Sequence, residues 1–291
     1  MLHIIGNETA GSGRGEKILH KVTAILDGMK TEYKLDLTKK AGDAERLAKN
    51  VLDKGDNEIV CVGGDGTVYE IVNGIAGRFA KLFFVPCGTG NDFVKTLGYP
   101  KDPIAAFKKQ LEGTPELIDC GKVNDRYFLN ISGGGFDVEV LKQASRFKKL
   151  GKGLVPYLLG IFAALKKFKG MSVEMTLDGK TVKKDITIFS VGNGRYFGGG
   201  MKSVPHAIVD DGLFDLIIAE KMGRAKILKL LSKFISGKHT ELPCISETRC
   251  KEFELSCPGM TVELDGELVQ MDSVRYEIIP KAFEIRKIAL S

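Results

Sequence analysis

The sequence lacks the cysteine and histidine patterns that hold small folds together through metals or disulfides. Its six cysteines include no C-x-x-C pair, and its four histidines are scattered along the chain. These spacings exclude an ordinary structural zinc site. We therefore expect reduced thiols, several of them buried, in a chain of 291 residues that is long enough to bury a core without such links.

Long apolar runs are also absent. No window reaches about 18 uninterrupted apolar residues, the length that a membrane-spanning helix needs. Residues 1–11 contain no basic segment followed by an apolar run, so no signal peptide is expected and a cytoplasmic location is predicted. Hydrophobic residues make up 43% of the chain and charged residues 27%. This ordinary balance excludes wholesale disorder, collagen-like repeats and a polytopic membrane protein.

Glycine and positive charge are in excess. The chain has 35 glycines, about 12% of its residues against a usual share of about 7%. Many special turns are therefore expected, because glycine adopts backbone conformations that other residues avoid. The 43 basic and 37 acidic residues give a formal net charge of +6. As an average this charge is too small to indicate a partner, and nucleic acid is not expected as one.

The first 120 residues alternate short apolar runs with helix-like stretches. This alternation predicts an α/β domain, an open parallel sheet with covering helices. The expected strands span residues 2–5, 32–37, 58–62 and 82–85, and the expected helices span residues 16–26, 43–52 and 103–113. Asp102 is expected to cap the last helix, with Pro103 at its first position.

From about residue 121 the pattern changes to alternation with a period of two. Residues 172–177 alternate in this way before Asp178-Gly179, a dipeptide typical of a tight hairpin turn. We expect a second, mostly antiparallel domain over residues 121–279, with 280–291 as a segment that can return to the first domain. Its other expected elements are a helix over residues 224–235 and two strands over residues 274–288 that are broken at Pro280.

Glycine-rich loops follow three of the expected strands. Residues 60–62 lead directly into Gly-Gly-Asp-Gly-Thr at 63–67, and two further loops lie at residues 88–92 and 7–13. Loops that follow parallel strands converge on one edge of the sheet, where glycine backbones and a helix N-terminus can hold phosphate. Asp65 would repel phosphate unless a divalent cation lies between them; otherwise it caps a tight turn. The spacing fits neither a P-loop nor a dinucleotide fingerprint.

Four motifs carry a family resemblance, and they are Gly-Gly-Asp-Gly-Thr at 63–67, Gly-Thr-Gly-Asn-Asp-Phe at 88–93, Asp-Asp-Gly-Leu-Phe-Asp at 210–215 and Leu-Asp-Gly-Glu at 264–267. In this order they resemble the diacylglycerol kinase catalytic-domain family, in particular its bacterial soluble lipid kinases. The loop at 88–92 favours this family over NAD kinases, which share the first motif. The resemblance covers essentially the whole chain. It implies a phosphofructokinase- and NAD-kinase-like open sheet followed by a mostly antiparallel, β-sandwich-like domain.

The resemblance also implies that the first domain binds ATP with Mg²⁺. The implied nucleotide-binding residues are Asn7, Glu8, Thr9, Ala10, Gly11, Thr38, Gly63, Gly64, Asp65, Gly66, Thr67, Val68, Tyr69, Glu70, Gly88, Thr89, Asn91 and Asp92. Asp65 is also expected to take part in catalysis, as a carboxylate that helps to hold the Mg²⁺ of the bound nucleotide.

Two Asp-Gly motifs of the second domain gain a role from the resemblance. Asp211, with the backbone carbonyls of Ile208 and Leu213, is implied to bind a structural Mg²⁺. Asp265 is implied to be the general base, with Glu267 as a member of the metal–water network or as the alternative base. On their own, both Asp-Gly pairs indicate only hairpin turns.

Residues 146–170 contain seven of the 43 basic residues and none of the 37 acidic ones, so the rest of the chain carries 36 basic against 37 acidic residues. The apolar centre at 154–165 is too short to span a bilayer. Basic flanks around an apolar stretch suit peripheral contact with an anionic membrane surface, at the inner face of the membrane. The alternative is a helix of the core with solvated lysines.

The predicted function is ATP-dependent phosphorylation of a lipid hydroxyl, with diacylglycerol as the expected acceptor, phosphatidic acid as the product and the lipid bound by the second domain. Two alternatives stay open. One is a kinase of a soluble substrate, like an NAD kinase, and the other is a nucleotide-binding regulatory protein without turnover. The sequence leaves the acceptor lipid and the oligomeric state undetermined, with a homodimer allowed.

Overall fold

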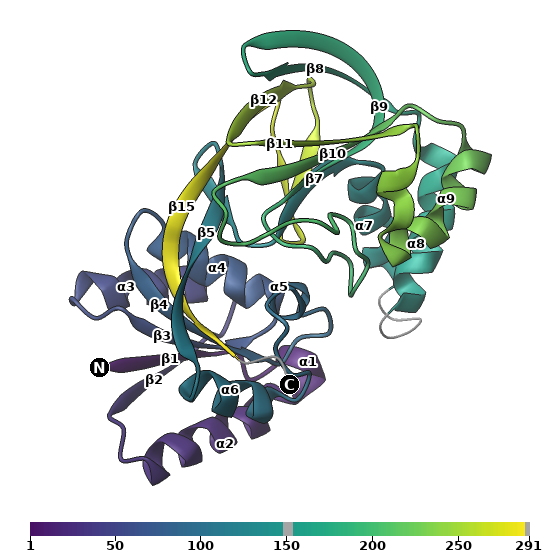
Figure 1. The fold of residues 1–291 in the computed structure, drawn as a ribbon. Helices are drawn as coiled ribbons and strands as arrows, with labels where there is room; N and C mark the ends of the chain where they lie inside the picture. Colours follow the sequence, from purple (N-terminus) through teal and green to yellow (C-terminus); the bar gives the residue numbers. More distant parts are fainter. Residues whose placement is uncertain (148–153, 289–291) are drawn as a thin grey trace. The chain divides into compact units, whose positions relative to one another are not determined.

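The computed structural model describes residues 1–147 and 154–288 (Figure 1). The contacts divide this part of the chain into two compact units. Unit 1 contains Met1–Cys120 and the residues from Ile279 onward, and unit 2 contains Gly121–Ile278. The chain therefore passes into unit 2 within strand β5 (Thr114–Val123) and returns within strand β15 (Ser273–Lys287).

Unit 1 is an open parallel sheet covered on both faces. Its strands lie in the order β15-β4-β3-β1-β2, with the bounds β1 (Leu2–Gly6), β2 (Tyr33–Leu37), β3 (Glu58–Gly63) and β4 (Ala80–Pro86). Strands β1 to β4 pair in parallel, and β15 pairs in parallel with β4 at Phe283 and Glu284. The predicted parallel sheet is confirmed.

The helices of unit 1 follow the apolar alternation of the strands. They are α1 (Ala10–Gly13), α2 (Gly15–Gly28), α3 (Asp43–Asp53), α4 (Asp65–Ile75), α5 (Asp92–Thr96) and α6 (Pro103–Leu111). Helices α2 and α6 bury Leu19 and Phe107 against Ile4 and Val62 of the sheet, while α3 and α4 pack together on the other face (Figure 1). Asp102 caps α6 as predicted, because its carboxylate accepts the Ala105 N–H at 2.8 Å.

Unit 2 is built from antiparallel pairs. The strands are β6 (Arg126–Phe128), β7 (Ile131–Gly135), β8 (Met171–Leu177), β9 (Lys180–Gly192), β10 (Phe214–Glu220), β11 (Ile245–Cys250), β12 (Glu252–Ser256), β13 (Thr261–Leu264) and β14 (Glu267–Gln270). They lie in the order β14-β13-β7-β9-β8-β12-β15, while β10 joins β9 to β11 and β5 joins β15 to β6. The predicted hairpin is confirmed, since β8 and β9 meet at Asp178 and Gly179, both with positive φ.

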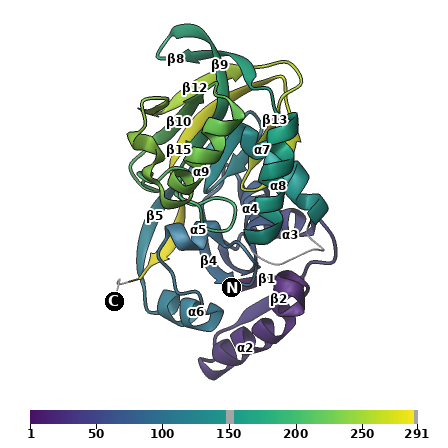
Figure 2. The same cartoon turned by 90° about the vertical axis from the view of Figure 1, so that its right-hand side faces the viewer.

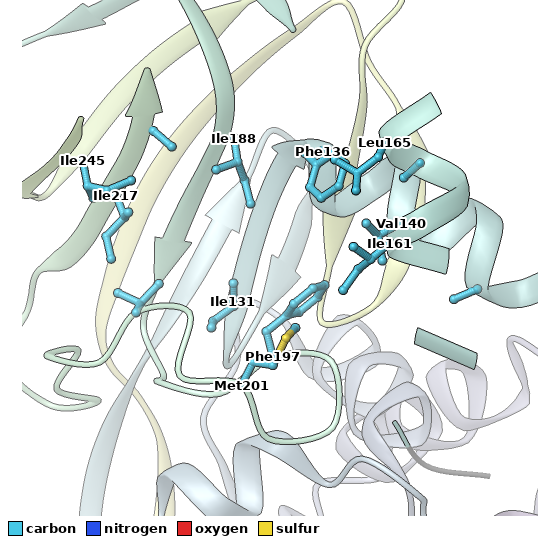
Figure 3. Close-up of a cluster of buried hydrophobic side chains, with 14 of the residues drawn as sticks. Ile131, Phe136, Val140, Ile161, Leu165, Ile188, Phe197, Met201, Ile217 and Ile245 are labelled. Carbon is cyan, nitrogen blue, oxygen red and sulfur yellow. The ribbon is translucent and has the colours of Figure 1, made fainter. Parts of the chain in front are cut away.

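The helices of unit 2 are α7 (Phe136–Phe147), α8 (Leu154–Lys167), α9 (Arg224–Ser236) and the 3₁₀ turn η2 (Lys238–Glu241). Helix α9 was predicted, whereas α7 was not. Helices α7 and α8 bury Phe136, Val140, Ile161 and Leu165 in an apolar cluster with β7, β9 and β10 (Figure 3). Within the basic segment predicted at 146–170, residues 148–153 lie outside the described residues.

Two details of the strands depart from, or add to, the predictions. The expected strand break at Pro280 is wrong, because β15 is one strand that pairs with β12 before this residue and with β4 after it. A local bend replaces the break: Lys281 has φ 53° and donates its N–H to Asp119 Oδ1 at 2.8 Å. Gly134 of β7 is required because a Cβ there would lie 2.5 Å from the Phe189 ring.

Candidate nucleotide site and candidate proton acceptor

The three glycine loops of unit 1 come together at the carboxyl ends of β1, β3 and β4. Their backbones approach so closely that side chains are excluded. A Cβ on Gly88 would lie 2.6 Å from Gly64 Cα, and a Cβ on Gly11 would lie 2.1 Å from the Cys87 carbonyl oxygen. Glycine is therefore needed at these positions to let the loops meet. The sequence predicted that the loops converge, although it assigned the glycines to close approach of a phosphate.

A cavity of about 630 Å³ opens at this edge of unit 1. Its volume is in the range of small-molecule sites. The predicted nucleotide-binding residues that line it are Asn7, Glu8, Thr9, Ala10, Gly11, Thr38, Gly64, Gly66, Thr67, Glu70 and Gly88. Lys39, Lys40, Ala41 and Ala44 also line the cavity, although the sequence did not predict them there. The sequence signal for them is the pair of lysines that follows Thr38, just after the strand that ends at Leu37. This pair could have indicated that one wall of the site is positively charged.

The polar side chains at the start of the cavity are held in place locally. The Asn7 side-chain oxygen accepts the Thr9 N–H at 3.0 Å and the Thr9 hydroxyl at 2.8 Å. The Thr38 N–H donates to the Gly6 carbonyl oxygen at 2.9 Å. The first loop and the end of β2 are thereby fixed to each other before any ligand binds.

Residues 39–44 form one wall of the cavity, and Glu70 holds this wall in place. Its two carboxylate oxygens accept the Gly42 N–H at 2.8 Å and the Ala44 N–H at 3.0 Å, at the start of α3. Asp43 accepts the N–H groups of Lys39 and Lys40, and the Lys39 bond is the main cause that lowers the pKa of Asp43. Backbone bonds to these two carboxylates therefore position the lysines.

Asp65 is not among the residues that line the cavity. One carboxylate oxygen accepts the Asp92 N–H at 2.8 Å, and the other accepts the Asn91 N–H at 2.7 Å. Burial, together with the neighbouring Asp92 carboxylate, raises the pKa of Asp65 to about 6. Asn91, in a left-handed conformation, closes the same loop by bonding both backbone groups of Gly88. The predicted residues outside the cavity lining are Gly63, Asp65, Val68, Tyr69, Thr89, Asn91 and Asp92.

Asp265 and Glu267 lie on either side of the turn between β13 and β14 and have very different surroundings. Asp265, with φ 50°, accepts three backbone N–H groups: Leu129 at 2.8 Å, Asn130 at 2.9 Å and Ile131 at 3.1 Å. These bonds occupy both carboxylate oxygens. Glu267 is exposed, and its side chain makes no hydrogen bond or ion pair with the described residues.

Asp211 forms an ion pair with the side chain of Arg249. One of its carboxylate oxygens contacts the Arg249 guanidinium, and the other accepts the Leu213 N–H at 3.1 Å. Asp215 lies 3.5 Å from the same guanidinium, and its buried Oδ2 has no hydrogen-bond partner among the described residues. Carboxylate oxygens are the donors that Mg²⁺ prefers. However, residues 1–147 and 154–288 contain no group of three or more acidic, histidine or cysteine side chains placed to hold a metal.

Unit 2 contains an apolar cavity of about 70 Å³ between α7, α8, α9 and the sheet. Phe136, Phe197 and Met201 are among its lining residues, and Figure 3 shows the last two at the loop that follows β9. Among the described residues of the lining, Asp137 is the only acidic one. Burial raises the pKa of this carboxyl to about 7, although the Val138 N–H donates to it at 2.7 Å.

Comparison with known proteins identifies the family. A model described as the diacylglycerol kinase catalytic domain matches residues 1–123, and one described as the YegS C-terminal NAD kinase beta sandwich-like domain matches residues 130–287. A diacylglycerol kinase of Mycobacterium tuberculosis is 31% identical over 296 residues, which cover 97% of this chain and 96% of that protein. The chain belongs to the diacylglycerol kinase family. The resemblance of the four motifs is thus confirmed.

Other members of the diacylglycerol kinase family agree in sequence and fold. A diacylglycerol kinase of Staphylococcus carnosus is 32% identical and covers 91% of this chain and 87% of its own. A crystal structure of a diacylglycerol kinase from Bacillus anthracis matches with a TM-score of 0.74 at 25% identity, over 97% of this chain and 95% of that one. The predicted fold class, an α/β domain followed by a β-sandwich-like domain, is confirmed. Among the described helices, none has the length and hydropathy to cross a bilayer.

Proposed function

We propose that this member of the diacylglycerol kinase family transfers the γ-phosphate of ATP to the free hydroxyl of diacylglycerol, giving phosphatidic acid. The observation that carries the proposal is the 630 Å³ cavity at the junction of the three glycine loops. A lipid kinase needs such a site for the polyphosphate of ATP. Membership of the diacylglycerol kinase family is the argument for a lipid as the phosphate acceptor. Unit 1 binds ATP, and unit 2 binds the lipid.

The nucleotide site works through backbone groups and cations. Free N–H groups at the start of α4 and in the glycine loops face phosphate oxygens, and the positive end of the helix dipole favours their charge. Lys39 and Lys40 add positive charge at the rim of the same cavity. Asp65 acts indirectly, because it holds the Asn91 and Asp92 amides that shape the second loop.

Glu267 is the proton acceptor in this proposal, and Asp265 positions it. The lipid hydroxyl oxygen forms a bond to the γ-phosphorus while the bond from that phosphorus to the bridging oxygen of ADP breaks. The hydroxyl proton moves to the Glu267 carboxylate. Asp265 is less suited to this step, because three backbone N–H groups already use its oxygens.

Mg²⁺ is the second cofactor of the proposal, and Asp211 with the carbonyls of Ile208 and Leu213 is its structural site in unit 2. The buried Asp215 Oδ2, which has no hydrogen-bond partner within residues 1–147 and 154–288, adds a donor of the right chemistry nearby. Arg249 must share or release the Asp211 carboxylate for a cation to bind. When bound with ATP, Mg²⁺ neutralises phosphate charge.

The test is transfer of label from γ-labelled ATP to diacylglycerol in mixed micelles, with phosphatidylglycerol, a sphingoid base and NAD as parallel acceptors. We expect labelled phosphatidic acid, and no product in excess EDTA. Glu267→Gln should lower kcat at least a hundredfold with unchanged stability, whereas the matched exposed variant Glu241→Gln should retain full activity. Transfer to NAD alone would support the soluble-substrate alternative, and ATP binding without any transfer would support the regulatory one.

Asp265→Asn separates the two acidic residues of the turn. An amide in place of the carboxylate turns an N–H group toward backbone donors, so we expect lower stability of unit 2 together with lost activity. Full activity in Glu267→Gln, with loss only in a stably folded Asp265→Asn, would assign the proton to Asp265 instead.

Membrane contact and location are part of the proposal. A lipid acceptor requires the enzyme to reach a bilayer, and the basic residues of 146–170 suit its anionic face. We propose a cytoplasmic protein that associates peripherally with the inner face of the membrane. A homodimer, the other association that the sequence leaves open, stays a prediction.

A further inference from the structure

Strand β2 leaves one edge of the unit 1 sheet open. It is the last strand in the order β15-β4-β3-β1-β2, and within residues 1–147 and 154–288 it pairs only with β1. Figures 1 and 2 show β2 at the rim of unit 1, next to α2. The strand contains no proline, and its register with β1 is regular. It therefore lacks the proline and the bulge with which many natural proteins block pairing at an edge.

The backbone groups at this open edge belong to every second residue of β2. The Thr38 N–H, directly after the strand, donates to the Gly6 carbonyl oxygen of β1 at 2.9 Å. Because the backbone groups of successive residues point to opposite edges of a strand, the residues that point away from β1 alternate with those that bond to it. The outward-pointing residues are Tyr33, Leu35 and Leu37. Their N–H and C=O groups can bond to water or to a further strand.

The same three residues place apolar side chains along the edge. Side chains alternate between the faces of a strand, so Tyr33, Leu35 and Leu37 share one face. Leu35 lies opposite Ile4 in the register with β1, and Ile4 belongs to the buried cluster under α2. This face is therefore the one that α2 covers. Tyr33 packs against the cluster, whereas Leu35 and Leu37 remain 39% and 37% exposed. A further strand at this edge would cover both leucines.

The charged residues on the opposite face select a second copy of this strand as the partner. Lys34 and Asp36 lie there side by side, with Nζ 3.1 Å from Oδ1. If two β2 strands pair antiparallel about Leu35, Lys34 of each copy lies opposite Asp36 of the other. A pairing centred on Lys34 or on Asp36 also brings outward-pointing backbone groups together, but it places two lysines or two aspartates directly opposite each other. Such like-charge pairs are destabilising, so the charge pattern allows one register and blocks its neighbours.

We propose that the protein forms a homodimer in which the β2 strands of two copies pair antiparallel about Leu35 and join their parallel sheets into one. Leu35 then exchanges N–H···O bonds with Leu35 of the second copy, and Tyr33 does so with Leu37 of the second copy. The contact is self-complementary, as a two-fold interface requires. This inference goes beyond the proposed lipid kinase, because none of its steps depends on the substrate. It supplies an interface for the homodimer that the sequence leaves open.

The test is analytical ultracentrifugation of the full chain over a range of concentrations, where we expect an equilibrium between monomer and dimer. Lys34→Glu turns both opposite-charge pairs of the interface into like-charge pairs, and Asp36→Lys does the same with the other sign. Each variant should raise the Kd of the dimer at least about tenfold. Lys54→Glu is the matched control, because it makes the same charge change at an exposed position in the turn after α3. It should dimerise as the original chain does.

An equal mixture of the Lys34→Glu and Asp36→Lys proteins tests the register itself. In a mixed dimer both cross-strand pairs again carry opposite charges, so the two proteins should associate with each other about as tightly as two original chains. A fluorescent label on one of them distinguishes the mixed dimer. Loss of folding cannot produce this recovery. Urea unfolding of each variant alone should match the original chain, since an exposed ion pair contributes little to stability.

Three outcomes would overturn the proposal. The first is an original chain that stays monomeric at every concentration. The second is a dimer that neither Lys34→Glu nor Asp36→Lys weakens, because the interface would then lie elsewhere. The third is a mixture that does not recover the dimer, because the charges would then not face each other. Failure of phosphate transfer to diacylglycerol would contradict the lipid kinase instead and would leave the sedimentation results unchanged.

Discussion

At the scale of single residues, the acidic side chains of this chain differ more in their surroundings than in their sequence context. Asp65 and Asp265 both occur in motifs that suggest chemistry, yet both accept backbone N–H groups and order a neighbouring loop. Asp137 has no motif and is buried in an apolar cavity. Burial and hydrogen-bond partners, which no single sequence displays, decide what each carboxyl can do.

Asp137 should make the stability of unit 2 depend on pH. Burial raises its pKa to about 7 in the folded chain, against an ordinary value of 3.8. The folded state then holds a proton that the unfolded state releases, so stability falls as pH rises from about 4 to about 7 and is level above that range. Asp137→Asn keeps the acceptor for Val138 but cannot titrate.

Urea unfolding at pH 4, 5, 6, 7 and 8 measures this effect. Relative to the original chain, the Asp137→Asn protein should gain about 4 kcal/mol between pH 4 and pH 7, the value of a shift of roughly three pKa units. Asp178→Asn, in an exposed turn, should show no such gain. A constant difference between the Asp137→Asn protein and the original chain over this range would exclude a titrating Asp137.

At the scale of elements, hydrophobic periodicity and glycine content predicted most of unit 1. Its four expected strands exist, and its glycine loops meet, because the strands are continuous apolar runs and glycine marks the turns between them. The sequence did not show that α7 follows the three glycines of β7, since its apolar positions mix with Asp137, Glu139 and Gln143. The sequence also did not show that β15 continues as one strand through Pro280.

The side-chain geometry of the candidate site was less predictable than its location. Eleven of the predicted nucleotide-binding residues line the cavity, but Lys39 and Lys40 were missed because their position depends on backbone bonds to Asp43. The pairing of Asp211 with Arg249 depends on β10 and β11 lying side by side, a contact between residues 38 positions apart. Such long-range contacts leave no local pattern in one sequence.

The contact between the glycine loops should be sensitive to a single methyl group. Gly88→Ala places a Cβ 2.6 Å from Gly64 Cα, so the second loop must move away from the start of α4. We expect ATP affinity, measured by isothermal titration calorimetry, to fall at least tenfold. Gly28→Ala is the matched control, since a Cβ there meets nothing within 4 Å and the backbone is not left-handed. Equal affinities in the two variants would mean that the loops do not form the nucleotide site.

At the scale of the whole molecule, the two units share strands. Strand β15 brings Phe283 and Ile285, which are 1% and 2% exposed, into unit 1 beside β4. The unit that carries the candidate nucleotide site is therefore discontinuous in sequence. A substitution that disturbs packing near residue 283 should therefore weaken ATP binding at the candidate nucleotide site, which is formed by residues 7–88.

Phe283→Ala tests this dependence. Removal of a fully buried phenylalanine ring leaves a cavity and typically costs about 3–5 kcal/mol. We expect earlier urea unfolding together with weaker ATP binding, whereas Lys287→Ala, an exposed residue of the same strand, should change stability by no more than about 0.5 kcal/mol. Retention of full stability in Phe283→Ala would show that unit 1 does not need this part of β15.

The shared strand also has a consequence for the order in which a ribosome can complete the protein. Residues 1–120 emerge first, but their sheet lacks its edge strand until residues 279–287 have been added. At about 5–20 residues per second, that delay is roughly ten to thirty seconds. Throughout it, the open side of β4 offers unpaired backbone groups and apolar side chains to any chaperone nearby. The first segment to be translated is thus the last to become a finished domain.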